Sequence, residues 1–243
     1  MFHVVIFVMR WRSPRAEIEH LIEAGDLEGL LRRAGELHGH YCPYLAYGVV
    51  AGYTAVRMLG VRSVGMEEVL AIVETNNCFS DGIQAVTGCT FGNNALIYLD
   101  LGKTAFTLAR RSGEAVRLAL NPEFEESRRA ERPELRELWR RIVTERERVS
   151  NEERIRFMEL MEEEAFDLLH RPASKMFIIR RMHIKAPDYA PIYASVRCHG
   201  CGELVMESRA GLRDGKPYCL SCLGAQHPIL DGRGIYIGVW RPE

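Results

Sequence analysis

The stretch His38-Gly-His-Tyr-Cys-Pro43 (HGHYCP) places two imidazoles, one thiol and a proline within six residues. In an extended backbone alternate side chains point to the same side, so His38, His40 and Cys42 would converge. A residue that precedes proline favours the extended region, which supports this geometry at Cys42. Two imidazoles and one sulfur can bind a transition metal, or they can form a thiolate with its own base. The stretch therefore predicts a site with either metal or thiol chemistry.

A helix is predicted directly after this stretch. Pro43 would occupy the first helical turn with Cys42 at the cap position, and apolar residues recur every three or four positions through residues 44–59. Gly60 then predicts the end of the helix. A thiol at the start of a helix has a lowered pKa, so Cys42 is a candidate thiolate.

The residues before the stretch predict two further helices. Ser13-Pro14 is typical of a helix start, and Gly25-Asp26 predicts a break before a short second helix that ends at Leu31. The apolar run Met1–Met9 is far shorter than a membrane span and lacks the features of a secretory leader. We interpret it as a short strand or an upstream extension, and we expect a cytoplasmic protein.

The segment after the long helix predicts a strand followed by a second cysteine-led helix. Val69–Val73 is a continuous apolar run of strand length. A short helix is expected over Cys78–Val86, where Cys78, Asp81 and Gln84 share one face because they are three residues apart. A second cysteine thus stands at a predicted helix start.

Three short apolar runs separated by turns follow, at residues 95–99, 104–108 and 115–120. They predict an antiparallel meander of three strands. Residues 1–122 would then form an α+β core with helices packed on a mainly antiparallel sheet. Residues 123–175 predict a charged helical connector, to which we assign no chemistry, and residues 176–243 predict strands followed by a small zinc-ribbon-like module.

The terminal module contains two C-x-x-C pairs, which consist of Cys198, Cys201, Cys219 and Cys222 with seventeen residues between the pairs. Four thiolates at this spacing can hold one tetrahedral zinc ion, which would be structural. Two redox-active dithiols are the alternative. His199 lies between the first two cysteines, but four sulfurs already complete the tetrahedron. The basic residues Arg209, Arg213 and Lys216 could contact nucleic acid or an acidic protein surface, although surface charges are usually only solvated.

The second group of metal-binding residues is His38, His40, Cys42, Cys78 and Cys89. Buried free cysteines and single histidines are common core residues, so a structural role is the alternative to a metal or reactive-thiol site. Imidazole and thiolate ligands suit zinc, nickel, copper(I) and iron alike, and the sequence does not choose among them.

Composition adds little about partners. The chain has 243 residues and a formal net charge of -1, which gives no overall electrostatic preference for nucleic acid or an anionic membrane. Its seven cysteines, an odd number grouped with histidines or in C-x-x-C pairs, indicate metal chemistry more than a disulfide framework.

Three stretches together resemble the E-subunit family of formylmethanofuran dehydrogenase: HGHYCP, the run from Val73 to Phe106, and the terminal cysteine module. The family motifs match at His38, Gly39, His40, Cys42, Pro43, Cys78, Asp81, Ile83, Gln84, Gly88, Cys89, Thr90, Gly92, Asp100, Gly102 and Lys103. Tyr44 and Asn94-Ala95 depart from the expected pattern and would reshape the pocket.

The resemblance implies an α+β domain, commonly dimeric, which is often followed by a small zinc finger. It further implies an accessory to a molybdo- or tungsto-pterin oxidoreductase, of the archaeal or anaerobe type. On this basis the leading hypothesis is a homodimeric metal-binding protein in which His40, Cys42 and Cys78 bind a transition metal such as zinc, nickel or iron. His38 and Cys89 would lie nearby, and Asp81, Gln84 and Lys103 would form a polar pocket wall.

Two other functions stay open. The first is a thiol-dependent or redox enzyme in which Cys42 is the nucleophile, His40 its base, and Cys89 or Cys78 the resolving thiol. The second is a metal-sensing regulator, because the terminal module also resembles the zinc fingers of certain RNA-polymerase-binding proteins. That regulator would bind a protein or nucleic acid through its finger.

Overall fold

The computed structural model describes residues 13–239, and the chain divides between Ala186 and Pro187 into two units. The apolar run Met1–Met9 lies outside the described residues. Among residues 13–239 no helix is both long and apolar enough to cross a membrane.

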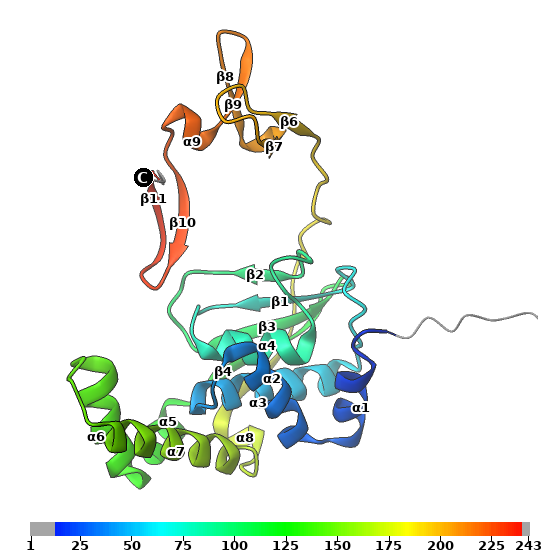
Figure 1. Ribbon diagram of the computed structural model, residues 1–243. Helices are drawn as coiled ribbons and strands as arrows, with labels where there is room; N and C mark the ends of the chain where they lie inside the picture. The colour runs from blue at the N-terminus through cyan, green and yellow to red at the C-terminus, as the bar shows by residue number, and fades with distance from the viewer. Residues whose placement is uncertain (1–12, 240–243) are drawn as a thin grey trace, which may run out of the picture. The chain divides into compact units, whose positions relative to one another are not determined.

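The first unit is a mixed α/β domain whose helices pack on a five-stranded sheet (Figure 1). Its elements are α1 (Ala16–Ala24), α2 (Leu27–His38), α3 (Pro43–Leu59), β1 (Val69–Val73), α4 (Cys78–Thr87), β2 (Leu96–Tyr98), β3 (Ala105–Arg110), β4 (Glu114–Leu120), α5 (Pro122–Glu131), α6 (Pro133–Trp139), the π-helical turn η1 (Arg140–Thr144), α7 (Asn151–Leu168), α8 (Ala173–Met176) and β5 (Phe177–His183). The predicted α+β class with a mainly antiparallel sheet is confirmed.

The order of strands differs from the predicted meander. In space the order is β2-β1-β3-β4-β5, and β2 pairs parallel with β1, whereas every other pair in this sheet is antiparallel. Helix α4 therefore connects two parallel neighbours, as a βαβ unit requires. The hairpin expected between residues 95–99 and 104–108 was wrong. The loop Asp100–Lys103 carries the chain to the other side of β1, so β3 pairs with β1 and not with β2.

Helix α2 is longer than predicted. The expected helix ended at Leu31, but α2 continues to His38 because Leu30, Leu31 and Ala34 all lie on its buried face. Gly35 adds to this packing, since a Cβ there would collide with the ring of Tyr41. Consequently the first histidine of HGHYCP ends a helix and does not begin an extended run.

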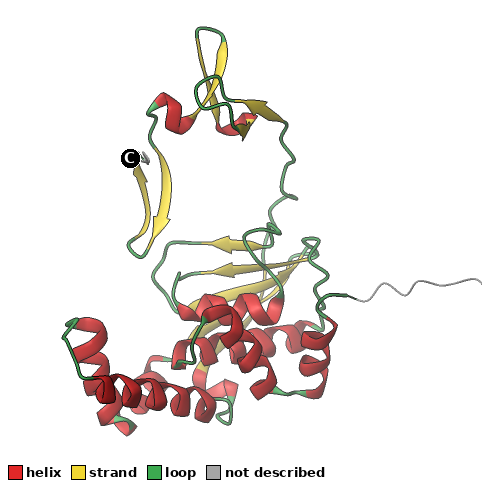
Figure 2. Ribbon diagram, viewed as in Figure 1, coloured by secondary structure: helices red, strands yellow, loops and turns green. Residues whose placement is uncertain are grey.

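The core lies between the sheet and helices α1–α4, which Figure 2 shows gathered along one face of the sheet. Helix α3 is central to it, with Leu45, Val49 and Ala55 fully buried. The connector helices α5–α7 extend from this core, and Ser150 and Glu153 form a capping box at the start of α7.

Strand β5 returns the chain to the core sheet. Its seven residues pair with β4, from Phe177 beside Leu120 to His183 beside Glu114. The sequence-based boundaries at residues 122 and 175 therefore separate strands that belong to one sheet. The structural division after Ala186 keeps the connector and β5 with the core.

A buried ionic cluster attaches the connector to α3. Tyr47 donates a hydrogen bond of 2.8 Å to Glu125, which also accepts two from Arg128, at 2.8 and 2.9 Å. Arg128 in turn donates to Glu164 on α7 at 3.0 Å. Burial alone would raise the pKa of the Glu125 carboxyl, but the hydrogen bonds and charge of Arg128 outweigh it and lower that pKa below 4.5.

Replacing Glu125 with glutamine is expected to destabilise the protein by roughly 3 kcal/mol near neutral pH, because Arg128 loses its buried counter-charge. A carboxyl whose pKa is lower in the folded state stabilises the fold above its unfolded pKa, and this contribution disappears as pH falls through the folded pKa. Urea unfolding should therefore show a difference between the wild-type and variant proteins that is large near neutral pH and shrinks progressively as the pH is lowered. A difference that does not shrink on acidification would contradict the assigned role of Glu125.

The second unit consists of three antiparallel hairpins and one short helix. Its elements are β6 (Ser195–Arg197), β7 (Leu204–Met206), the 3-10 turn η2 (Glu207–Arg209), β8 (Ala210–Arg213), β9 (Lys216–Cys219), α9 (Leu220–Leu223), β10 (His227–Asp231) and β11 (Gly234–Gly238). Strand β6 pairs with β7, and the β8–β9 hairpin connects the two cysteine pairs.

Candidate metal centre

The two histidines of HGHYCP are brought together by the end of α2. His38 is the last helical residue, and Gly39 follows in the left-handed conformation at φ 90°, which favours glycine. This turn redirects the chain so that His40 folds back, and the two imidazole centroids lie 4.4 Å apart. The predicted convergence is present, but a helix end followed by a glycine turn produces it, not a continuous extended run.

The two cysteines stand at the starts of neighbouring helices. Cys42 caps α3 in an extended conformation (φ -155°, ψ 161°), with Pro43 in the first turn as predicted. Cys78 is the first residue of α4, where the Asn77 side chain accepts a hydrogen bond of 3.0 Å from the Phe79 amide. Both sulfurs therefore lie at helix amino termini.

Two glycines bring these helix starts together. A Cβ on Gly48 of α3 would collide with the backbone carbonyl of Phe79, and a Cβ on Gly82 of α4 would lie 2.7 Å from the backbone nitrogen of Val49. Helices α3 and α4 thus touch backbone to backbone, with no side chain between them. This close approach places Cys42 beside Cys78.

The result is a group of four side chains whose ligand atoms all lie within 4.8 Å of one another: His38, His40, Cys42 and Cys78. Two imidazole nitrogens and two sulfurs at this separation suit a tetrahedral ion. The residues fit a metal in a second way, because the Nε2 atom of His38 is buried and has no hydrogen-bond partner. A buried nitrogen without a partner is costly unless something binds it.

The other ring nitrogen of His38 is held in place. Its Nδ1 lies 2.7 Å from the Asp81 carboxylate, which also accepts a hydrogen bond of 3.1 Å from Gln84. A carboxylate on one imidazole nitrogen fixes the tautomer that leaves the other nitrogen free to bind metal. Asp81 and Gln84 therefore lie behind a candidate ligand, and His38 itself belongs to the group of four converging side chains.

The acid–base properties of the group agree with this arrangement. A hydrogen bond from Cys42 lowers the pKa of the Cys78 thiol to about 6, with a further contribution from His38. The same shared hydrogen bond, together with burial, raises the pKa of Cys42. Burial and the neighbouring His38 lower the pKa of His40. Without a metal the two sulfurs thus share one proton, and the histidine is kept in its neutral, metal-binding form.

Two predicted site residues lie elsewhere. Cys89 is fully buried, its thiol lies 3.7 Å from the carbonyl of Val69, and it is not one of the four converging residues. Burial raises the pKa of Cys89 to about 11, as for a core thiol. Lys103 is an exposed residue in the turn before β3.

The four cysteines of the second unit also converge, with all ligand atoms within 4.8 Å of one another. The Cys219 amide donates to the Cys198 sulfur at 3.2 Å, and the Cys222 amide donates to the Cys219 sulfur at 3.4 Å. Gly200 has to be glycine here, because a Cβ would lie 2.9 Å from the Cys222 sulfur. These features are those of a four-cysteine zinc site.

His199 takes no part in that group. Its ring contacts Tyr218 with the centroids 5.6 Å apart, and its Nε2 lies 3.3 Å from the Lys216 ammonium. Arg213 also lies over Tyr218, at 5.0 Å from the ring centroid. Two of the predicted basic residues are therefore tied to side chains of their own module.

A cavity of about 530 Å³ adjoins the core group. It is lined by Pro43, Tyr44, Asn77, Cys78, Thr104, Arg128, Arg129, Arg132, Leu135, Arg136, Trp139 and Val143. The predicted pocket wall of Asp81, Gln84 and Lys103 is not part of this lining. The sequence did not predict the cavity, because its outer wall comes from the charged connector. In that segment Arg128, Arg132 and Arg136 are four residues apart, and Trp139 follows three residues later.

Comparisons with known proteins agree with both parts of the chain. The family model described as "FmdE, Molybdenum formylmethanofuran dehydrogenase operon" matches residues 37–178. A second model, "Prokaryotic dksA/traR C4-type zinc finger", matches residues 191–226. The first match includes all four residues of the core group, and the second includes all four finger cysteines.

Two individual proteins are similar to this chain. A protein from Archaeoglobus fulgidus named "Probable S-adenosyl-L-methionine-binding protein" is 42% identical over 214 residues. Those residues are 86% of this chain but only 56% of that relative's length. The crystal structure of a tungsten formylmethanofuran dehydrogenase FmdE-like protein from Syntrophus aciditrophicus has a TM-score of 0.52 and 24% identity, and the match covers 82% of this chain and 92% of that one. That structure shares the fold.

Proposed function

Because this chain belongs to the FmdE family, we propose that it is a metal-binding accessory protein with one transition-metal ion in its core and one structural zinc ion in its finger. The observation that carries the core assignment is the convergence of His38, His40, Cys42 and Cys78 within 4.8 Å. The buried Nε2 of His38, which has no hydrogen-bond partner, supports it.

The donor set narrows the choice of metal. Two neutral imidazoles and two thiolates favour zinc or iron(II) in tetrahedral geometry over the harder magnesium and calcium ions, which prefer oxygen ligands. With both sulfurs deprotonated, a divalent ion would make the centre electrically neutral. That neutrality suits a group in which Cys42 is only 2% exposed.

The metal interpretation is favoured over the thiol-enzyme alternative by the position of Cys42. A nucleophile has to be reached by its substrate, and the Cys42 side chain is buried in the core, with its sulfur within 4.8 Å of the Cys78 sulfur. Cys78 is partly buried and is the member of the group that lines the cavity. A substrate would therefore meet Cys78 first.

Metal content of the full chain, purified without air or added metal, tests the proposal. We expect mass spectrometry to find one ion per core group and one zinc ion per finger. Cys42→Ser should lose the core ion alone, because a serine hydroxyl is a poor ligand for a soft site and the finger is in a separate unit.

Cys89→Ser is the matched control, since Cys89 is an equally buried thiol of the same unit outside the ligand group. It should keep both ions. Equal metal content in the wild-type and Cys42→Ser proteins would refute the core site, whereas loss of the core ion in Cys89→Ser as well would show that the core thiols act through folding and not through coordination.

The accessory role rests on the family name, which refers to a molybdenum formylmethanofuran dehydrogenase operon. We propose that the chain works as a homodimer beside a molybdenum or tungsten oxidoreductase. On the outer strand β5, Ile178 and Met182 are 44% and 43% exposed, so apolar side chains are available there for contact with another chain. Co-elution of the metal-loaded protein with such an oxidoreductase in size-exclusion chromatography would support this role, and separate elution of the two would count against it.

A further inference from the structure

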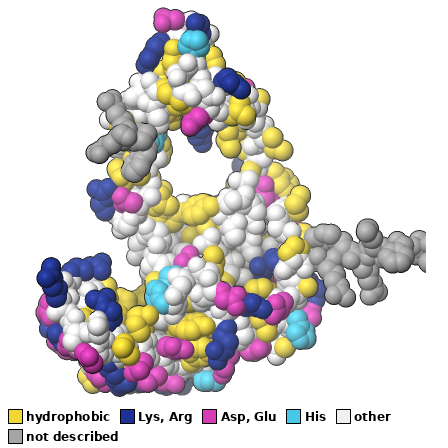
Figure 3. Space-filling view, in the orientation of Figure 1, with side chains coloured by type: hydrophobic (Ala, Val, Ile, Leu, Met, Phe, Trp, Pro, Cys, Tyr) yellow, Lys and Arg dark blue, Asp and Glu magenta, His cyan; other side chains and the backbone are white. Residues whose placement is uncertain are grey.

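The cavity beside the core group has the size of a ligand site. Its volume of about 530 Å³ falls within the range of roughly 300–1,000 Å³ that small-molecule pockets occupy. One wall consists of the starts of α3 and α4, and the other consists of α5, α6 and η1. In Figure 3 the surface is hollowed between the helices at the lower left, where Lys and Arg side chains gather, and the rest of the first unit.

All charged residues in the connector wall of the cavity are arginines. Three of them are neutralised by carboxylates behind the wall, because Arg128 pairs with Glu125 and Glu164, Arg129 with Glu125, and Arg132 with Glu164 and Asp167. Four arginines against these three carboxylates leave one net positive charge on the connector wall. That wall therefore presents an excess of cationic charge to an occupant of the cavity.

Arg136 carries that excess charge. It is an exposed residue of α6 whose guanidinium makes no hydrogen bond or ion pair within residues 13–239. The neighbouring Glu137 is paired with Arg140, which lowers the pKa of the Glu137 carboxyl more than the charge of Arg136 does. A guanidinium that lines a concave surface and lacks a carboxylate is free to bind a carboxylate, sulfonate or phosphate group with two parallel hydrogen bonds.

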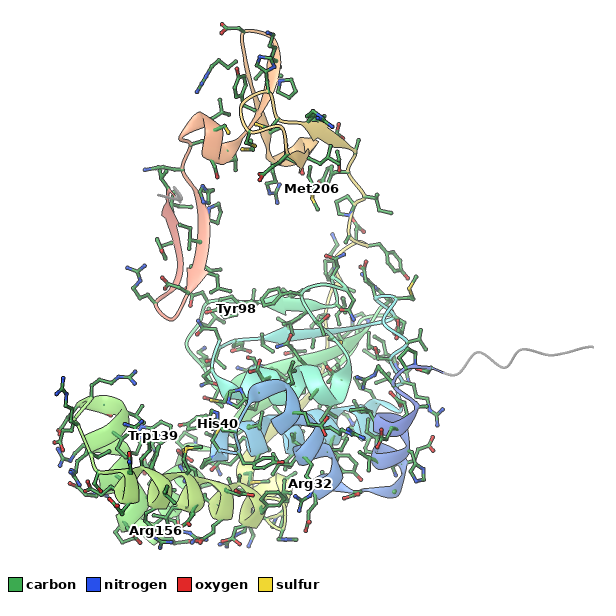
Figure 4. All side chains as sticks on the ribbon, in the orientation of Figure 1. Arg32, His40, Tyr98, Trp139, Arg156 and Met206 are labelled. Atoms are coloured by element: carbon green, nitrogen blue, oxygen red, sulfur yellow. The ribbon has the colours of Figure 1, made fainter. Side chains whose placement is uncertain are left out.

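The rest of the connector wall is apolar. Leu135, Trp139 and Val143 line it, and Trp139, labelled in Figure 4, is half-buried. Its indole ring is fixed by an edge-on contact with Phe157, with ring centroids 6.0 Å apart. A fixed tryptophan in a ligand-sized cavity offers a flat surface for a ring-sized apolar group.

We propose that this cavity binds an organic anion with an aromatic or similarly flat apolar body, whose acidic group pairs with Arg136 and whose body packs against Trp139. Such an occupant would reach Cys78, which is both a lining residue and a member of the core metal group. The cavity thus brings an organic anion next to the metal centre. This inference goes beyond the proposed metal site and depends only on the cavity.

Two fluorescent probes test the proposal with the full chain. One is 8-anilinonaphthalene-1-sulfonate, an aromatic anion, and the other is N-phenyl-1-naphthylamine, which has the same ring system without the sulfonate. We expect the sulfonate to bind with one-to-one stoichiometry. Arg136→Gln should weaken its binding roughly tenfold, since one charge-assisted contact is lost, and Arg136→Lys should recover part of the affinity.

Arg154→Gln is the matched control, because Arg154 is an exposed connector arginine outside the cavity, without an ion pair in the described part of the chain. It should bind the sulfonate like wild type, and the uncharged probe should bind all variants about equally. Unchanged binding in Arg136→Gln, equal weakening in Arg154→Gln, or no one-to-one binding to the wild type would each overturn the proposal. Metal content is read separately by mass spectrometry, so failure of this site and failure of the metal site are distinguishable.

Discussion

Gly48→Ala is expected to disrupt the proposed core metal centre without altering any candidate ligand. The new methyl group would collide with the backbone carbonyl of Phe79, and a backbone atom in a helix cannot rotate away as a side chain can. Helices α3 and α4 would have to separate, which moves Cys42 away from Cys78. Because overpacking against side chains already costs about 1–3 kcal/mol, we expect a loss of roughly 3 kcal/mol or more in unfolding free energy.

Urea unfolding and metal content would measure this effect, and alanine substitutions at two other glycines serve as graded controls. A Cβ on Gly52, one turn further along α3, would lie 3.1 Å from a Val86 side-chain carbon, so Gly52→Ala should be milder. A Cβ on Gly92 would meet nothing within 4 Å, so Gly92→Ala should behave like wild type. If Gly48→Ala were as stable as Gly92→Ala and kept its core metal, the backbone contact would not determine the geometry of the site.

Cys198→Ser is expected to unfold the second unit while leaving the first intact. Structural zinc contributes about 10–16 kcal/mol of apparent binding free energy in zinc-finger peptides near neutral pH, far more than the packing of three short hairpins can supply. Loss of one of four thiolates should therefore release the zinc and expose residues 187–239 to protease. The first unit has its own core and should keep its unfolding transition.

His199→Ala is the control for the cysteine variant. His199 lies in the same C-x-x-C pair, but its ring contacts Tyr218 and takes no part in the four-cysteine group. The variant should retain one zinc ion and resist protease like wild type. Protease resistance of Cys198→Ser after zinc loss would contradict the view that the metal supplies the stability of this unit.

Local signals in the sequence predicted the elements that carry the two core sulfurs. Pro43 and Gly60 mark the start and end of α3, and the apolar run Val69–Val73 is β1 itself. These predictions succeeded because proline, capping residues and continuous apolar runs act over a few residues of the chain. The positions of the cysteines and histidines in the sequence were also enough to identify both groups as candidate metal sites. Cys89, which was named with the core group, is not one of the four residues that converge there.

The features that the sequence could not predict depend on contacts between distant segments. The sequence of a single strand does not determine which strands lie beside it. The pairing of β1 with β2 and of β5 with β4 could therefore not be predicted. The backbone contact of Gly48 with Phe79 likewise joins two helices that are separated along the chain. The cavity was missed for the same reason, since its arginines resemble an ordinary solvated face until the connector packs beside α3 and α4.

The candidate metal ligands and the connector wall of the cavity lie in different segments of the chain, and this separation has a consequence for how such proteins can diverge. All four candidate metal ligands lie between residues 38 and 78, whereas the cationic and aromatic wall of the cavity lies between residues 128 and 143. If both proposals hold, substitutions in the connector can change which molecule is accepted and leave the candidate metal ligands in place. A descendant of this chain could then acquire a new small-molecule specificity through changes in α5, α6 and η1 while it inherits the same candidate metal ligands.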